Sequence, residues 1–475
     1  MSDRFVAGLS GYLPLMRMDR AAAARALKFS NLSGRGAGFR AVAGWDEDPV
    51  TLALEAARPF AMGSNISKLV FASTSAPFFE RAHAPLLVDA LTLDPSVRSF
   101  DVAGSRRCAL SALLDALLGS GDALIAAGEK RSAQAGNPLH LAFGDGGAAV
   151  RVSDRGGARL IGHASRTADF VDLYASREHP YAYGYEERFV REVLVARIVA
   201  PTIKAALANA GATPDRVAFA AVHEPVAGAW RDIAKQTGIG APNLAADLAA
   251  GAGDLGAAHA LYAAALAFER AAVGDLVLVA GFGSGCDALV FEKTGALSGV
   301  REAAQHLREG VATDDYVRFL SLTEALDLDW GVRAEFEQKA QATVLARYGR
   351  DMMGFVGGRD SAGNVQFPKS NIPVRPDATG PEKLADVRLA DEPARIVSAT
   401  ADRLNFTPDP PFWFGLVQFD CGARIMMEFT DDSDGGFSVG DPVRMRFRIK
   451  SRNRQLGFRT YFWKAAPLAR PAMGA

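Results

Sequence analysis

The stretch GAGDLGAAHALYAAALAFERAAVGDLVLVAGFGSGCDALVF, residues 251–291, decides the fold. Its alanine-rich part at 256–272 is typical of a helix, and DLVLVAGFGSG at 275–285 is typical of a buried strand that ends in a glycine-rich turn. Short apolar runs of the same kind alternate with helical stretches through residues 1–295, at 67–74, 123–129, 148–154 and 216–224. Because strands buried on both faces form continuous apolar runs, the alternation predicts an α/β fold with covered sheets.

The composition is that of an ordinary globular protein with two or three domains, since 49% of its 475 residues are apolar. Its 53 basic and 54 acidic residues leave a net charge of −1, which argues against nucleic acid or an anionic membrane as partner. No apolar run approaches the length of a membrane span, and residues 1–20 lack a secretory pattern, so we expect a cytoplasmic protein. Three scattered cysteines (Cys108, Cys286 and Cys421) are too few for a disulfide framework or a metal site.

The character of the sequence changes after residue 295. Charged helical sequence at 296–353 predicts a helical linker, and 354–378 is rich in loop-forming residues. Residues 379–475 contain five short β-rich runs joined by polar turns, which predict a small barrel of the OB type, closed or partly open.

Three parts of the α/β region carry recognisable motifs. They are a first strand and helix, GLSGYLPLMRM (8–18) with AGWDEDPVTLALEAAR (43–58); a glycine-rich turn, FGDGGAAVRV (143–152); and the last loop, helix and strand at 251–291. Together these stretches resemble the thiolase superfamily, and more closely its hydroxymethylglutaryl-CoA synthase branch. The resemblance implies an αβαβα sandwich of two similar halves, 1–165 and 166–295, and a homodimer. It also implies an acyl-CoA or related thioester as substrate, with coenzyme A as substrate or product carrier and no permanently bound cofactor.

His223 lies in AVHEP (221–225), directly after a predicted strand, where open α/β proteins place their sites. The stretch is similar to the one that carries the family's catalytic histidine, which would polarise a thioester carbonyl or carry a proton. The other interpretation is a histidine with structural hydrogen bonds alone. Asp254 stands where the family usually has an asparagine. Either it acts as an acid or an orienting group beside His223, or it caps the helix that follows.

Cys108 follows a candidate helix cap, Ser105, and two arginines, Arg106 and Arg107. A helix start and neighbouring cations lower the pKa of a thiol, which favours a nucleophile. However, an ungapped comparison with the family places Arg106, not Cys108, at the position of the nucleophilic cysteine. Two interpretations of Cys108 therefore stay open, a nucleophile and a packed helix residue, and Arg106 is expected to contact the substrate.

Two further segments bear on the substrate. Thr74 occupies the position of the synthase branch's acid/base glutamate, and Glu80 lies too far along the chain to replace that group. We therefore expect Thr74 to contact the substrate, and we do not expect synthesis of hydroxymethylglutaryl-CoA. The turn formed by Gly283, Ser284 and Gly285 either lines an acyl or oxyanion pocket with its backbone N–H groups or allows tight packing between sheet layers.

The C-terminal part has a second resemblance. Residues 357–376 and the β-rich sequence after them are similar to the acyl-CoA-associated OB domain with its rubredoxin-like zinc ribbon. That ribbon contains two cysteine pairs, whereas no cysteine lies between residues 287 and 420 here. The segment 354–378 is therefore predicted to be a degenerate ribbon without zinc.

Basic residues alternate along one predicted strand of the barrel and so share one of its faces. They are Arg444, Arg446, Arg448 and Lys450. Either they hold the phosphates of coenzyme A or of an acyl carrier, or they form a solvated edge that discourages aggregation.

These features predict an acyl-CoA-dependent enzyme that forms or cleaves a carbon–carbon bond beside a thioester, by Claisen or retro-Claisen acyl transfer. Two alternatives stay open. One is a cysteine-independent retro-aldol lyase that acts on a β-hydroxyacyl-CoA. The other is a non-catalytic, acyl-CoA-binding scaffold for a partner thiolase. The sequence around His223 favours catalysis, while the departures at Thr74 and Arg106 favour the alternatives.

Overall fold

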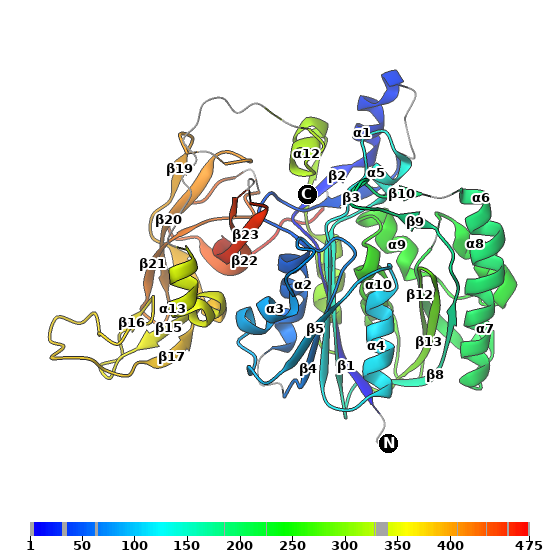
Figure 1. Cartoon of the computed structure of the whole chain (residues 1–475), viewed down its shortest axis with the longest axis horizontal. Coiled ribbons are helices and arrows are strands. Elements are labelled where there is room, and N and C mark those ends of the chain that lie inside the picture. Colours follow the sequence, from blue (N-terminus) through cyan, green and yellow to red (C-terminus); the bar gives the residue numbers. More distant parts are fainter. Residues whose placement is uncertain are drawn as a thin grey trace.

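Figure 1 shows the computed structural model of the chain, which describes residues 4–473 apart from a few short segments. The segments left out are 31–35, 62–64, 185, 225, 327, 329–340, 406, 434 and 454–455, and for 341–346 and 348 only the backbone is described. Pro225 of the predicted HEP stretch, and part of the predicted linker, thus lie outside the described residues.

A nine-stranded sheet with the order β11-β12-β13-β8-β1-β7-β6-β4-β5 forms the frame. Its first half contains β1 (Phe5–Tyr12), β4 (Lys68–Ala72), β5 (Arg98–Val102), β6 (Ala123–Glu129) and β7 (Gly146–Ser153). Its second half contains β8 (Ala158–Thr167), β11 (Val217–Val222), β12 (Leu276–Phe282) and β13 (Gly285–Lys293).

The two halves repeat one topology. In each half two antiparallel pairings are followed by a parallel one, so that β1-β7-β6-β4 corresponds to β8-β13-β12-β11. The halves meet where Phe5 and Val6 of β1 pair with Arg159 and Ala158 of β8. The predicted limit between the halves, 165/166, falls inside β8, a strand whose pairing belongs mainly to the second half.

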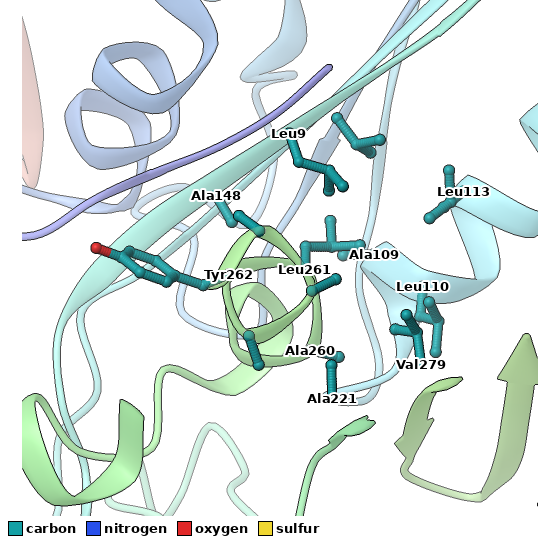
Figure 2. Close-up of a cluster of buried hydrophobic side chains, with 14 of the residues drawn as sticks. Leu9, Ala109, Leu110, Leu113, Ala148, Ala221, Ala260, Leu261, Tyr262 and Val279 are labelled. Carbon is teal, nitrogen blue, oxygen red and sulfur yellow. The ribbon is translucent and has the colours of Figure 1, made fainter. Parts of the chain in front are cut away.

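Helices fill the space between the halves and cover both outer faces (Figure 1). The middle layer is α4 (Cys108–Leu118) and α10 (His259–Arg270), and the outer layers are α2 (Pro49–Ala57) with α3 (Ala84–Ala90), and α7 (Ala200–Asn209) with α8 (Ala229–Thr237). Figure 2 shows Leu261 of α10 facing Ala109 of α4, and such small side chains let the layers pack closely. This confirms the predicted αβαβα sandwich.

The predicted helical linker returns to the first half of the sandwich. It contains α11 (Val300–Arg308), α12 (Tyr316–Leu322) and α13 (Gln341–Gly354), and also a strand, β14 (Val311–Thr313). This strand pairs with β2 (Met16–Asp19), which in turn pairs with β3 (Phe39–Val42).

Shorter elements complete the α/β part: α1 (Arg20–Ala26), α5 (Pro138–Ala142), β9 (Leu173–Tyr174), β10 (Tyr183–Gly184), α6 (Glu187–Phe189), a π-helix (Val190–Val199) and α9 (Leu244–Gly251). Within the described residues, no helix has both the length and the apolar character needed to cross a bilayer.

The predicted ribbon segment persists as a small sheet, in which β15 (Val356–Arg359) pairs with β16 (Val365–Gln366) and β17 (Ala385–Arg388). Asp360 holds the turn between the first two strands. Its carboxylate accepts the backbone N–H of Ala362 at 3.0 Å and that of Asn364 at 2.8 Å. A hydrogen-bonded aspartate therefore organises this loop.

The C-terminal strands form the predicted OB-type barrel. They are β18 (Ala394–Ile396), β19 (Thr400–Asp402), β20 (Phe412–Phe419), β21 (Arg424–Glu428), β22 (Pro442–Asn453) and β23 (Phe458–Pro467). The order is β19-β20-β18-β22-β23, with β21 beside β20. A bridge between Phe429 and Ala465 brings the end of β21 to β23 and partly closes the barrel.

Buried ion pairs join the barrel to the outer face of the first half. Four acids at α2 and just before it each pair with a cation of β22 or β23: Asp46 with Lys464 at 3.0 Å, Glu47 with Arg448 at 3.0 Å, Asp48 with Arg459 at 2.9 Å, and Glu55 with Arg446 at 2.6 Å. The two parts also share one apolar core. The barrel is thus an integral layer of the molecule.

This interface corrects both interpretations for Arg446 and Arg448, two of the four basic residues on that strand face. Arg446 and Arg448 are buried and paired with acids of the α/β part, so they neither hold phosphate nor form a solvated edge. Lys450 pairs with Glu428 of the barrel itself. The alternation along β22 was visible in the sequence, but the acids of the α/β part that pair with Arg446 and Arg448 lie about 400 positions earlier.

The interface predicts an acid-sensitive fold. Burial raises the pKa of Glu55, but the charges of Arg58 and Arg446 outweigh it and lower that pKa to about 2 from its usual 4.5. A depressed carboxyl pKa gives stability that is complete above the unfolded pKa and is lost as the pH falls toward the folded value. We expect Glu55 to contribute about 3 kcal/mol at neutral pH that disappears between about pH 5 and pH 2.

Urea unfolding over this pH range tests the expectation. Glu55→Gln should be less stable than wild type at neutral pH, and the difference should shrink as the pH falls. Glu302→Gln changes an exposed glutamate on α11 and is the matched control, for which we expect no pH-dependent difference. A Glu55→Gln deficit that is constant with pH would contradict the assignment.

Candidate functional site

The candidate site lies at the C-terminal ends of β6 and β11. The N-terminal end of α4 and the loop that precedes α10 complete it. Glu129 and Arg131 stand at the end of β6, and His223 directly follows β11. Arg106 lies two residues before α4, and Asp254 lies in the loop between α9 and α10. Chain segments that are far apart in the sequence thus bring several ionisable groups together.

His223 and Asp254, the predicted pair, are in contact. The Nε2 atom of His223 lies 3.0 Å from Oδ1 of Asp254, out of line for a well-formed hydrogen bond, so the contact is chiefly electrostatic. The histidine is only 2% exposed, whereas the aspartate side chain is 19% exposed. Asp254 is therefore the member of the pair that solvent or a ligand reaches more easily.

Asp254 is a carboxylate among cations. Its Oδ2 accepts a hydrogen bond from Arg106 at 2.9 Å and lies 3.0 Å from Nη1 of Arg131. Burial raises the pKa of Asp254, but His223 and the two arginines outweigh this and hold the pKa well below its usual range. The predicted protonated form is therefore not favoured. Asp254 does not cap α10, although its Oδ1 accepts the N–H of Gly256 at 2.8 Å.

Arg106 is the centre of the charge network. Besides Asp254 it pairs with Asp172, and its guanidinium lies over the ring of Phe282 at 4.5 Å. Burial lowers the pKa of Arg106, but the two carboxylates outweigh it and raise that pKa, so a permanent cation stands at this place. Arg131 is held similarly, with its guanidinium 3.7 Å from the ring centre of Phe143.

His259, the first residue of α10, stacks on His223 with ring centres 4.4 Å apart. Its Nδ1 accepts the N–H of Leu255 at 3.2 Å, and its Nε2 donates to the carbonyl of Ala245 at 3.1 Å. Burial and the nearby His223 lower the pKa of His259 to about 3. It is thus a neutral ring that fixes the position of His223.

The ligand atoms of His223, Asp254 and His259 lie within 4.8 Å of one another, a grouping found in metal sites. Both nitrogens of His259 are occupied by backbone groups, and two guanidinium groups beside Asp254 repel a cation. These residues therefore do not fit a metal ion.

Cys108 borders this network, with Glu129 nearby, but its side chain lies in an apolar setting. It is 7% exposed and belongs to the apolar core between the halves. Burial, together with the nearby Glu129, raises the pKa of its thiol to about 12, so the predicted lowering of this pKa is wrong. Arg106 and Arg107 form ion pairs with acids and do not lower the pKa of the Cys108 thiol. Ser105 is not the side-chain cap either, because α4 begins at Cys108 itself.

Thr74 contacts Glu129, a residue that the sequence interpretation missed. The fully buried Glu129 carboxylate accepts the N–H and the hydroxyl of Thr74 at 2.8 and 2.9 Å, the hydroxyl of Ser75, and the N–H of Ala257 at 3.1 Å. Glu129 thereby ties the loop after β4 to the loop that carries Asp254. Thr74 therefore stands beside the site, and the carboxylate next to it is that of Glu129, from the neighbouring strand β6.

The glycine-rich turn packs closely against the start of α4. A Cβ on Gly283, whose φ is +144°, would lie 2.8 Å from Cβ of Ser105. The N–H of Gly283 donates to the carbonyl of Gly285 at 3.0 Å, and the carbonyl of Ser284 accepts from Arg107 at 3.1 Å. The packing interpretation therefore holds for Gly283, because its N–H is already used within the turn.

A cavity of about 520 Å³ reaches this network from one side. Asp172, the partner of Arg106, is in its wall, and so are residues of the segment after β6 such as Asn137 and Leu139. Tyr183 and Val226 contribute from the second half. The cavity therefore meets the charge network at Asp172.

The sequence interpretation missed Glu129, Arg131, Asp172 and His259. Glu129 and Arg131 carried a usable signal, because Glu129 ends the apolar run at 123–129, Arg131 lies two residues later, and polar groups at strand ends form sites in α/β folds. Asp172 lies in a loop with no motif, and only the fold brings it to Arg106.

Comparison with known proteins agrees with this architecture. Residues 386–448 match the family described as "ChsH2, C-terminal OB-fold domain". The chain is 24% identical over 333 residues to hydroxymethylglutaryl-CoA synthase of Pyrococcus furiosus, covering 67% of this chain and 93% of that protein. The present chain thus joins a thiolase-superfamily, hydroxymethylglutaryl-CoA synthase-like domain to a C-terminal OB-fold domain.

Solved structures share the fold of the synthase-like domain. MvaS in complex with 3-hydroxy-3-methylglutaryl coenzyme A superposes with a TM-score of 0.54 at 16% identity, covering 70% of this chain and 95% of that one. The 3-oxoacyl-(acyl carrier protein) synthase III of Pseudomonas aeruginosa superposes with a TM-score of 0.54 at 19% identity, covering 62% and 99%.

The cysteine environments predict an order of alkylation. Burial raises the pKa of both Cys108 and Cys286 to about 12, so very little of either thiol is ionised at about pH 8. Cys421 is partly exposed. We expect iodoacetamide to label Cys421 well before the other two, as measured by peptide mass mapping. Labelling of Cys108 ahead of Cys421 would contradict the buried, unreactive thiol.

Proposed function

We propose that this protein forms or cleaves a carbon–carbon bond beside a coenzyme A thioester in the aldol sense, without an acyl-cysteine intermediate. The observation that carries the proposal is the buried network of Arg106, Asp254 and His223, set against a thiol at Cys108 whose pKa is raised. The relationship to acyl-thioester condensing enzymes supports the thioester as substrate class.

The proposed step needs only proton transfer and charge stabilisation. In the cleavage direction, the His223–Asp254 pair takes the proton of the β-hydroxyl group. The bond between Cα and Cβ breaks, its electrons move into the thioester as an enolate, and Cα then takes a proton. An aldehyde or ketone leaves, and a shorter acyl-CoA remains, so no cofactor or oxidant is required.

The arginines supply the positive charge that the enolate needs. Arg131 makes one ion pair within the described part of the chain, so a single acid neutralises its guanidinium. Arg106 is held by two acids and stands where the resemblance places the family's nucleophile. Fixed cations in a buried site stabilise developing negative charge strongly, because they need no reorganisation.

The expected homodimer and a possible thiolase-family partner remain predictions.

The first test is hydrogen exchange at Cα. We expect the protein to catalyse deuterium uptake into acetyl-CoA or propionyl-CoA in D₂O, followed by mass spectrometry, because enolisation exposes Cα to exchange. His223→Ala and Asp254→Asn should lower the rate about a hundredfold or more. Cys108→Ala should keep it, as should Cys286→Ala, which is the matched buried cysteine outside the network.

Intact-protein mass after incubation with the same thioesters gives the opposing outcomes. An acyl adduct that disappears in Cys108→Ala would overturn the proposal in favour of Claisen-type acyl transfer through that cysteine. Coenzyme A binding with neither an adduct nor exchange would overturn it in favour of a non-catalytic scaffold.

A further inference from the structure

A second cavity, of about 290 Å³, lies between the synthase-like domain and the barrel. Arg81 and Leu86 line it from the first half, Arg350 and Met353 from α13, and Phe458 and Arg459 from β23. Three guanidinium groups from three separate parts of the chain therefore meet around one space. This cavity shares no lining residue with the one that reaches Asp172.

Two of the three arginines are neutralised. Arg459 pairs with Asp48 at 2.9 Å, and Arg350 pairs with Asp89 at 3.2 Å. Arg81 has no acid partner among the residues that the structure describes, and its Nη1 atom is buried without a hydrogen-bond partner there. A buried guanidinium donor without a partner is costly, which points to a ligand that completes it.

Aromatic rings hold Arg81 in place. Its guanidinium lies 4.8 Å from the ring centre of Phe78 and 5.0 Å from that of Phe458, and the two ring centres are 5.9 Å apart, so the cation rests on a pair of adjoining rings. Such stacking fixes the plane of the donors without using their N–H groups. The arrangement is thus a preformed fork for an oxyanion.

We propose that this cavity binds a phosphate ester, with the phosphate on Arg81 and the organic part against Phe458 and Met353. Arginine forks bind phosphate in a bidentate manner, and the cavity is far larger than a bare phosphate requires. Phe458 is 40% exposed and offers a ring face to a flat group. A free nucleotide and the nucleotide end of coenzyme A are two sources of this chemistry.

Because the walls come from both domains, a bound ligand stabilises their contact. The site is also connected to the candidate active site through one short segment. Thr74, which bonds to Glu129, and Phe78 and Arg81 belong to the same loop between β4 and α3. The inference does not depend on the proposed reaction, since it rests on the cavity and on Arg81.

Calorimetric titration of the whole protein with AMP tests the site. We expect binding to wild type and a dissociation constant about tenfold or more higher in Arg81→Gln. Arg81→Lys should be intermediate, because it keeps the charge and loses the fork. Arg98→Gln is the matched control, because Arg98 also stacks on a phenylalanine, Phe100 at 5.5 Å, but lies outside the cavity.

Thermal unfolding without ligand shows whether the variants are folded. No binding of AMP or coenzyme A to wild type, equal binding to Arg81→Gln, or binding of benzoate in place of AMP would each overturn the proposal. Competition separates the two sources. If coenzyme A displaces AMP and binds Arg81→Gln more weakly than wild type, the nucleotide end of coenzyme A is the ligand. If AMP still binds in the presence of saturating coenzyme A, the ligand is a separate nucleotide. Both results support the site.

Discussion

The buried acidic run before α2 is the constraint on which the rest of the structure depends. Asp46, Glu47 and Asp48 are taken out of water when the sandwich forms, and a buried charge without a partner costs several kcal/mol. The barrel supplies the missing cations. Asp48 also caps α2 through the N–H groups of Val50 and Thr51, so the same residue starts a helix and holds a domain.

A second buried network gathers opposite charges in the candidate site. His223, Arg131 and Arg106 together hold the pKa of Asp254 well below its usual range, so this carboxylate stays ionised. The neutral ring of His259 keeps the histidine in position. A thiolate would need a polar, partly exposed setting, and Cys108 instead packs in the core. The two networks obey one rule, that each buried charge is met by an opposite one from a distant segment.

Sequence reasoning succeeded where the signal was local. The apolar runs with glycine-rich ends predicted the sheets, and the position of His223 after a strand predicted its place at the site. It failed for the pKa of Cys108 because the helix start and the neighbouring arginines are local features, whereas burial is a property of the whole core. It failed for Arg446 and Arg448 because alternation along a strand does not reveal what covers that face.

The sequence pattern by itself determined an α/β region with covered sheets, a β-rich C-terminal barrel and the lack of cysteine between residues 287 and 420, because these follow from periodicity and residue type. The sandwich arrangement was predicted from the family resemblance. Only the tertiary structure decided which charges are paired. Coulomb interactions act over a few ångströms in space, and the partners of Glu55, Asp254 and Arg106 lie 391, 148 and 66 positions away along the chain. Folding alone brings those atoms together, and it thereby decides which residues form the site.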